Sequence, residues 1–112
     1  MLHRSMNSAQ LLHLALDDLL AELRHARRNG DMGRMALIVW CELRPWARRA
    51  GEAEVAERVA AIMVHSPHAS RADFQREVDA LIELLSRVLQ RRQGSGLGQP
   101  TASGRATGPG PT

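Results

Sequence analysis

The residues whose types and spacing could do chemistry are mainly arginines near the ends of predicted helices. Arg44, Arg48 and Arg49 surround Trp46, and Arg44 and Arg48 are one helical turn apart. Guanidinium groups beside an indole can hold a phosphate, an acidic partner helix or single-stranded nucleic acid. A solvated surface with Trp46 in the core explains the same pattern, so both interpretations stay open at this point. The candidate anion- or partner-binding patch comprises Arg44, Trp46, Arg48, Arg49, Arg91 and Arg92.

Histidine and cysteine do not form a recognisable catalytic or metal-binding set. His65 and His68 are three positions apart, but no second pair of ligands accompanies them, and zinc needs about four. Cys41 is the single cysteine and lies in an apolar run, so we expect a small core residue and not a nucleophile. The glycine-rich run that begins at Gly94 follows the last predicted helix. We therefore expect no catalytic residue, no metal site and no cofactor.

One spacing points to a possible enzyme. Arg58 is separated from His65 by six residues, which resembles the spacing in HEPN-type helical ribonucleases. The residue after the arginine, polar in that family, is Val59 here. The resemblance covers these positions alone and implies RNA cleavage by Arg58 and His65 as a remote alternative. Otherwise we expect no enzymatic activity.

The composition is that of an ordinary globular domain with an unusual choice of cation. The 112 residues carry 15 cations, all arginine, against 12 acidic residues, and the net charge of +3 is modest. Arginine without lysine indicates a GC-rich, bacterial genome. A lone cysteine fits a reducing cytoplasm, and no stretch approaches the roughly 20 apolar residues of a membrane span. We expect a cytoplasmic protein with no membrane segment.

Apolar periodicity predicts helices throughout and no strand. Residues 35–41 are apolar without interruption, and their flanks continue at helical spacing. We therefore expect a central helix that is buried on several sides, and we expect the side chain of Trp40 to be buried with it. Pro45 should kink this helix or end it, and we favour the kink. Expected N-caps are Asn7 or Ser8, Asp31 and Ser70. The predicted fold is an all-α four-helix bundle, with helices over about 8–28, 32–50 (kinked at Pro45), 52–64 and 71–93.

The chain divides into one folded domain and a tail. Residues 1–93 should form the helical domain. Residues 94–112 are rich in Gly, Pro, Ser and Thr and cannot bury enough apolar surface to offset their ordering entropy, so we expect disorder there. In an up-down-up-down bundle, the second and fourth helices end at the same pole, which would gather the arginine patch.

Surplus apolar surface favours a protein-binding function. The central helix offers more apolar surface than three short neighbours need, and methionines suit an adaptable contact. We expect a small helical protein–protein interaction module (an adaptor, a chaperone-like protein or a regulator), with self-association as one outcome. The alternative is an arginine-rich nucleic-acid-binding accessory protein, although the acidic first half of the last helix would repel phosphates. The candidate apolar partner surface comprises Leu14, Met32, Met35 and Leu84.

Overall fold

The computed structural model describes residues 7–65 and 70–96, with side chains of the last helix described through residue 94. Within these ranges the chain is helical and contains no strand, so the predicted all-α fold is confirmed. The disordered tail was expected over 94–112. Residues 97–112 lie outside the described residues, and 94–96 belong to the last helix, contrary to prediction. The elements are α1 (Ser8–Arg28), α2 (Met32–Leu37), the π-helix η1 (Ile38–Leu43), α3 (Arg44–Ala50), α4 (Ala53–Val64) and α5 (Arg71–Gly96).

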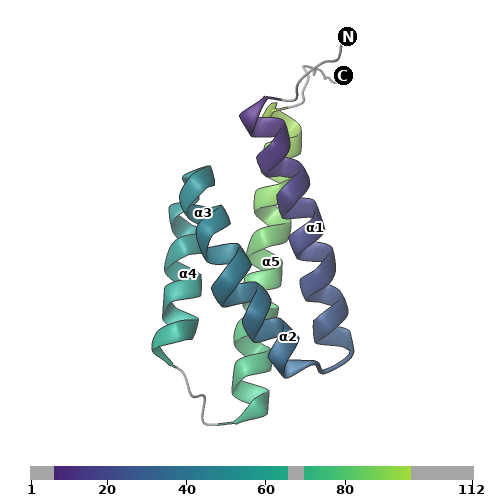
Figure 1. The fold of residues 1–112 in the computed structure, drawn as a ribbon, viewed down its shortest axis with the longest axis vertical. Helices are drawn as coiled ribbons and strands as arrows, with labels where there is room; N and C mark the ends of the chain where they lie inside the picture. The colour runs from purple at the N-terminus through teal and green to yellow at the C-terminus, as the bar shows by residue number, and fades with distance from the viewer. Residues whose placement is uncertain (1–6, 66–69, 97–112) are drawn as a thin grey trace, which may run out of the picture.

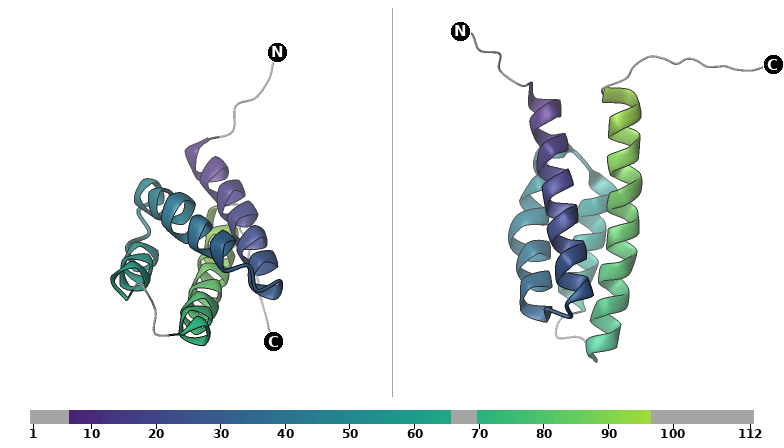
Figure 2. Two further views of the ribbon diagram at one scale, coloured as in Figure 1. Left: turned by 60° about the horizontal axis from the view of Figure 1, so that its bottom comes forward. Right: turned by 90° about the vertical axis from the view of Figure 1, so that its right-hand side faces the viewer.

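The helices run alternately in opposite directions, as expected for an up-down-up-down bundle (Figure 1). Because α2, η1 and α3 follow one another without a break, they act as one helix, the α2–η1–α3 rod. α1 packs against α5 and against this rod, and α4 packs against α3 and α5 (Figure 2). The C-terminal ends of α3 and α5 therefore lie at one end of the bundle, together with the start of α1.

Polar caps and a left-handed glycine fix where α1 ends and α2 begins. Asn7 accepts a hydrogen bond from the backbone N–H of Gln10 at 2.8 Å, and the Gln10 side chain accepts one from the Asn7 N–H at 3.1 Å. This reciprocal pair is a capping box. Gly30 has a φ of 65°, which favours glycine after a helix, and Asp31 then accepts from the N–H of Arg34 at 3.1 Å.

Pro45 lies inside the rod and the chain passes it as a helix. Proline has no N–H to donate, and its ring crowds the carbonyl four residues earlier. The π-helix η1 ends directly before α3, in which Pro45 is the second residue. Backbone hydrogen bonds in a π-helix span five residues and not four, so the bonding pattern changes next to the position where Pro45 lacks an N–H. Continuation of the helix past Pro45 is confirmed, and the π-helical turn is the feature that the sequence did not predict.

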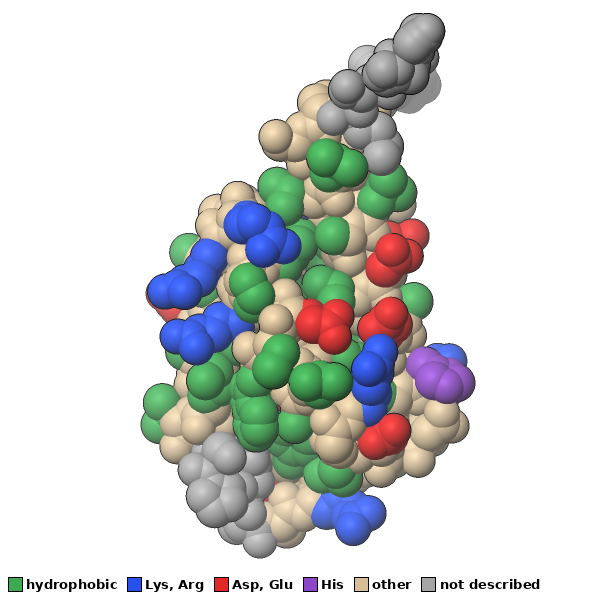
Figure 3. All heavy atoms as spheres, viewed as in Figure 1, with side chains coloured by type: hydrophobic (Ala, Val, Ile, Leu, Met, Phe, Trp, Pro, Cys, Tyr) green, Lys and Arg blue, Asp and Glu red, His purple; other side chains and the backbone are tan. Residues whose placement is uncertain are grey.

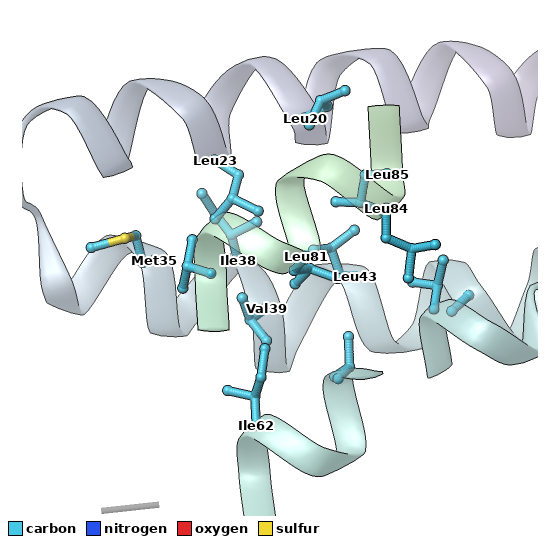
Figure 4. Close-up of a cluster of buried hydrophobic side chains, with 14 of the residues drawn as sticks. Leu20, Leu23, Met35, Ile38, Val39, Leu43, Ile62, Leu81, Leu84 and Leu85 are labelled. Carbon is cyan, nitrogen blue, oxygen red and sulfur yellow. The ribbon is translucent and has the colours of Figure 1, made fainter. Parts of the chain in front are cut away.

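The core lies where α1, the rod, α4 and α5 meet, and Figure 4 shows its side chains converging from these helices. Met35 is fully buried and Leu84 is 2% exposed, so their assignment to a partner surface was wrong. Leu84 is buried because α5 packs against both α1 and α4, which widens the part of its surface that is covered. Met35 is covered in the same core cluster, from the first turn of the rod.

The outer side of the rod has no helix over it (Figure 1). Leu37 is 45% exposed, Cys41 is exposed and Trp40 is half-buried, so the predictions of a core Cys41 and a fully buried Trp40 were wrong. An uninterrupted apolar run signalled a helix buried on several sides, but the described residues supply only three other helices to cover it. No helix within the described ranges combines the length and apolar content that crossing a membrane requires.

Candidate functional site

The predicted arginine patch separates into two groups that have different surroundings. One group consists of Arg91 and Arg92 at the end of α5, which make ion pairs with the start of α4. The other consists of Arg44, Arg48 and Arg49 on α3, which are exposed and have no ion-pair partner among the described residues. Both groups lie toward the same end of the bundle. The first group makes ion pairs within the fold, whereas the second presents its charges to solvent.

Arg92 is held by contacts with two helix ends. Its Nε donates to Glu52 at 2.9 Å, and a terminal nitrogen donates to the carbonyl oxygen of Ala50 at 3.0 Å. Arg91 donates to the same Glu52 carboxylate at 2.7 Å. A cation at the last carbonyls of α3 also opposes the negative end of that helix dipole. These contacts join the end of α5 to the junction between α3 and α4.

Trp46 belongs to the same structural group and is not a surface residue. Its side chain is 0% exposed, and its indole Nε1 donates to the carbonyl oxygen of Leu12 at 2.9 Å. The guanidinium carbon of Arg92 lies 5.5 Å from the centre of the Trp46 ring, within cation–π range. The assignment of Trp46 to a binding patch was therefore wrong. We call Trp46, Glu52, Arg91 and Arg92 the Trp46 cluster.

A groove of about 450 Å³ runs between α1 and the rod, next to the exposed α3 arginines. Ala15 and Leu19 supply apolar lining from α1. The exposed thiol of Cys41, the only cysteine of the chain, lines it from the rod. Pro45 also lines it, so the π-helical turn that accommodates the proline also shapes this wall. The full lining is Ala15, Asp18, Leu19, Glu22, Cys41, Glu42, Pro45 and Arg49.

Carboxylates line this groove, and exposed arginines lie on its α3 side. The carboxylates come from both walls, Asp18 and Glu22 from α1 and Glu42 from η1. In Figure 3, blue side chains gather over α3 and red ones lie toward α1. Glu22 pairs with Arg34 at 3.0 Å. Asp18 and Glu42 have no ion-pair partner among the described residues, although Arg49 lines the same groove. The bundle thus leaves both signs of charge unpaired on one face.

Exposed leucines border the acidic side of the groove. Leu11 is 53% exposed and Leu14 is 46% exposed. Leu11 is seven residues before Asp18, so both project from nearly the same side of α1, and Leu14 lies on the adjacent outer side. The exposure of Leu14 agrees with its predicted place in an apolar surface. We define the α1–α3 face as the groove lining together with Leu11, Leu14, Arg44 and Arg48.

A second hollow, of about 550 Å³, opens on the opposite side of the rod. Met32 and Trp40 line it, and both are partly exposed; a partner-binding role for Met32 stays a prediction. The indole Nε1 of Trp40 is buried and has no hydrogen-bond partner among the described residues, whereas Nε1 of Trp46 donates to Leu12. The remaining lining residues are Gly33, Ala36, Ser70, Arg71 and Phe74.

The side of α1 that faces α5 has its charges satisfied. Arg27 makes two hydrogen bonds to Asp79, at 2.7 and 3.1 Å, and these bonds raise the pKa of Arg27 above its ordinary value. Arg24 donates to the hydroxyl of Ser86 at 2.6 Å. This side of α1 stabilises the bundle, which leaves the opposite, groove-facing side as the candidate site.

The two residues of the ribonuclease hypothesis lie on α4 and at its C-terminal end. Arg58 is exposed on α4, and an imidazole nitrogen of His65 lies 2.9 Å from the Glu77 carboxylate. His68 lies outside the described residues. In the described part of the chain, no three His, Cys, Asp or Glu side chains are grouped so that they could hold a metal ion.

Sequence reasoning missed the acidic half of the α1–α3 face. Two signals were available: the seven-residue spacing of Leu11 and Asp18, and Glu42 directly after the apolar run. Comparison of the chain with models of protein families, with curated proteins and with solved structures gives no match. The site is therefore interpreted from its own residues.

Proposed function

We propose that the protein is a small helical protein–protein interaction module of the bacterial cytoplasm, an adaptor, chaperone-like protein or regulator, that binds its partner on the α1–α3 face. The observation that carries the proposal is the coincidence, on one face, of exposed leucines, an open groove and unpaired charges of both signs. Exposed apolar residues bordered by polar ones are typical of protein-binding surfaces. Unpaired charges add specificity and orient the partner.

A folded protein partner fits this face better than a nucleic acid does. The α3 arginines alone would suit phosphates. However, Asp18, Glu22 and Glu42 line the groove beside them, and a phosphate backbone laid along the groove would meet these carboxylates. A protein surface can present cations to one side and anions to the other. Arginine-mediated nucleic-acid binding therefore remains the second candidate, confined to the α3 side.

The exposed thiol of Cys41 offers a direct test because no other cysteine competes for a label. A photo-cross-linker attached to Cys41 should form a discrete cross-linked protein product in an extract of the source cells. The variant Leu11→Gln/Leu14→Gln should lose the product while remaining folded, because both leucines are about half exposed. Removal of an equally apolar residue elsewhere, Val64→Gln at 78% exposure, should leave the product intact.

Position-matched labelling provides the control. A chain with Cys41→Ser and Arg87→Cys carries the cross-linker at an exposed position on α5 and should give no discrete product. Absence of a product from Cys41, or its persistence in the double-leucine variant, would contradict the proposal. A cross-link to RNA or DNA that is lost with Arg44→Glu/Arg48→Glu would instead support the second candidate.

A further inference from the structure

We infer that the partner of the α1–α3 face is a second copy of this chain, docked about a two-fold axis parallel to α1. This inference rests on the proposed function, because it names the occupant of the same face. It starts from the distribution of charge: carboxylates line the groove, Asp18 from α1 and Glu42 from η1, and exposed arginines lie on α3. Each copy carries both halves of a complementary pair side by side, and among the described residues these side chains make no ion pair.

Symmetry determines which halves meet. In an isologous contact, each residue of one copy meets a residue of the other, and the reverse contact is made as well. A two-fold axis that lies in the interface and runs parallel to α1 exchanges the two sides of the face, so α3 of one copy lies over α1 of the other. An in-plane axis perpendicular to α1 would instead place α3 on α3 and α1 on α1, with like charges opposed. Charge complementarity selects the first arrangement.

The residues that would pair make no ion pair with any other described residue. Arg44 and Arg48 are exposed on α3, and Asp18 of α1 and Glu42 of η1 line the groove. In the selected arrangement, the two arginines of each copy lie over the groove of the other, where Asp18 and Glu42 are located. The leucines at positions 11 and 14 then lie under the aliphatic stems of the partner's arginines, which can cover apolar surface.

Sedimentation equilibrium over a dilution series, under reducing conditions, tests this inference with charge reversals. The wild-type chain should change from monomer to dimer as concentration rises, and added salt should weaken the dimer. Arg44→Glu/Arg48→Glu and Asp18→Arg/Glu42→Arg should each weaken the dimer by at least about thirtyfold, because several attractive pairs become repulsive. Circular dichroism establishes that each variant is folded.

Mixing tests whether the reversed residues lie in the interface, whereas the weakening of each reversed chain's own homodimer is what requires unlike sides to face each other. Equimolar mixing of the two reversed chains should give a heterodimer, because each reversed side then meets its opposite charge. The chain carrying all four reversals should recover the homodimer. If it stays monomeric while the wild type dimerises, these four side chains do not pair across the interface and the inference is wrong. If the two double reversals leave the dimer unweakened, the arrangement with α3 over α1 is wrong as well. A wild-type chain that remains a monomer at about 0.5 mM overturns the inference as well.

The outcome also separates this inference from the proposed function. A monomeric wild-type chain that still gives a discrete Cys41 cross-link to a different protein overturns self-association and leaves the proposed function standing. A monomeric chain that gives no cross-link contradicts both. A dimer that is unaffected by any of the four reversals uses another surface and overturns this inference, and the Cys41 cross-link then decides the proposed function by itself.

Discussion

The Trp46 cluster and the α3 arginines lie at the same end of the bundle, but they have opposite surroundings. Arg92 is bound by a carboxylate, a carbonyl and an indole ring, and its side chain is only 20% exposed. Arg48 is exposed and has no partner among the described residues. An arginine near a helix end therefore stabilises the fold when a carboxylate at the start of another helix lies within reach, as Glu52 does for Arg92. An arginine without such a neighbour is available to bind a partner.

The largest expected effect comes from breaking the Trp46 cluster at its centre. Trp46→Ala should reduce the free energy of unfolding by about 3–5 kcal/mol, because it removes a fully buried aromatic side chain and the bond to Leu12. Urea unfolding followed by circular dichroism measures this loss. A loss below about 1 kcal/mol would mean that Trp46 is not in the core.

A smaller loss should follow from removing the shared carboxylate. Glu52→Ala should cost about 1–3 kcal/mol, because Arg92 would remain largely buried without its main acceptor. The measurement is a double-mutant cycle with Arg92→Ala in urea unfolding. Additive losses for the two substitutions would show that the pair is not coupled, contrary to the geometry.

The two tryptophans should respond differently to removal of the indole N–H. Trp40→Phe should change the free energy of unfolding by less than about 1 kcal/mol. The buried Nε1 of Trp40 donates no hydrogen bond to a described residue, and the side chain is only half-buried. Trp46→Phe should cost more, because it removes a made hydrogen bond. Thermal unfolding of both variants by circular dichroism ranks them, and the reverse order would contradict the structure.

The smallest effect on stability is expected on the α3 arginines. Arg48→Ala should change the free energy of unfolding by no more than about 0.5 kcal/mol, because the residue is exposed and makes no ion pair. Urea unfolding at low protein concentration measures this value without a contribution from self-association. Arg92→Ala in the same buffer is the matched comparison. Equal losses of unfolding free energy for Arg48→Ala and Arg92→Ala would contradict the distinction between the α3 arginines and the Trp46 cluster.

The sequence was sufficient for the helices because their signals are local. Asn7, Gly30, Asp31 and Ser70 act at the predicted helix ends, and the apolar spacing of α1 and α5 is sustained over several turns. The bounds of α1 agree with the prediction. The direction of each helix followed from the short connections.

The sequence was insufficient for the surface because exposure depends on which neighbours are present. Cys41 and Trp40 lie in the most apolar run of the chain, and they are accessible because no helix covers the outer side of the rod. Trp46 and Arg92 were grouped correctly by position, but only the location of Glu52 shows that they hold the fold together. The π-helical turn at 38–43 has no recognised sequence signal beyond the proline that follows it.

The most direct test of the central claim, that the α1–α3 face is covered when the protein assembles, is the rate at which Cys41 reacts with a thiol reagent at increasing protein concentration. If the face is an interface between copies, the rate constant per thiol should fall as concentration rises, and it should stay constant for Arg44→Glu/Arg48→Glu. A rate constant that is independent of concentration for the wild-type chain would contradict the claim.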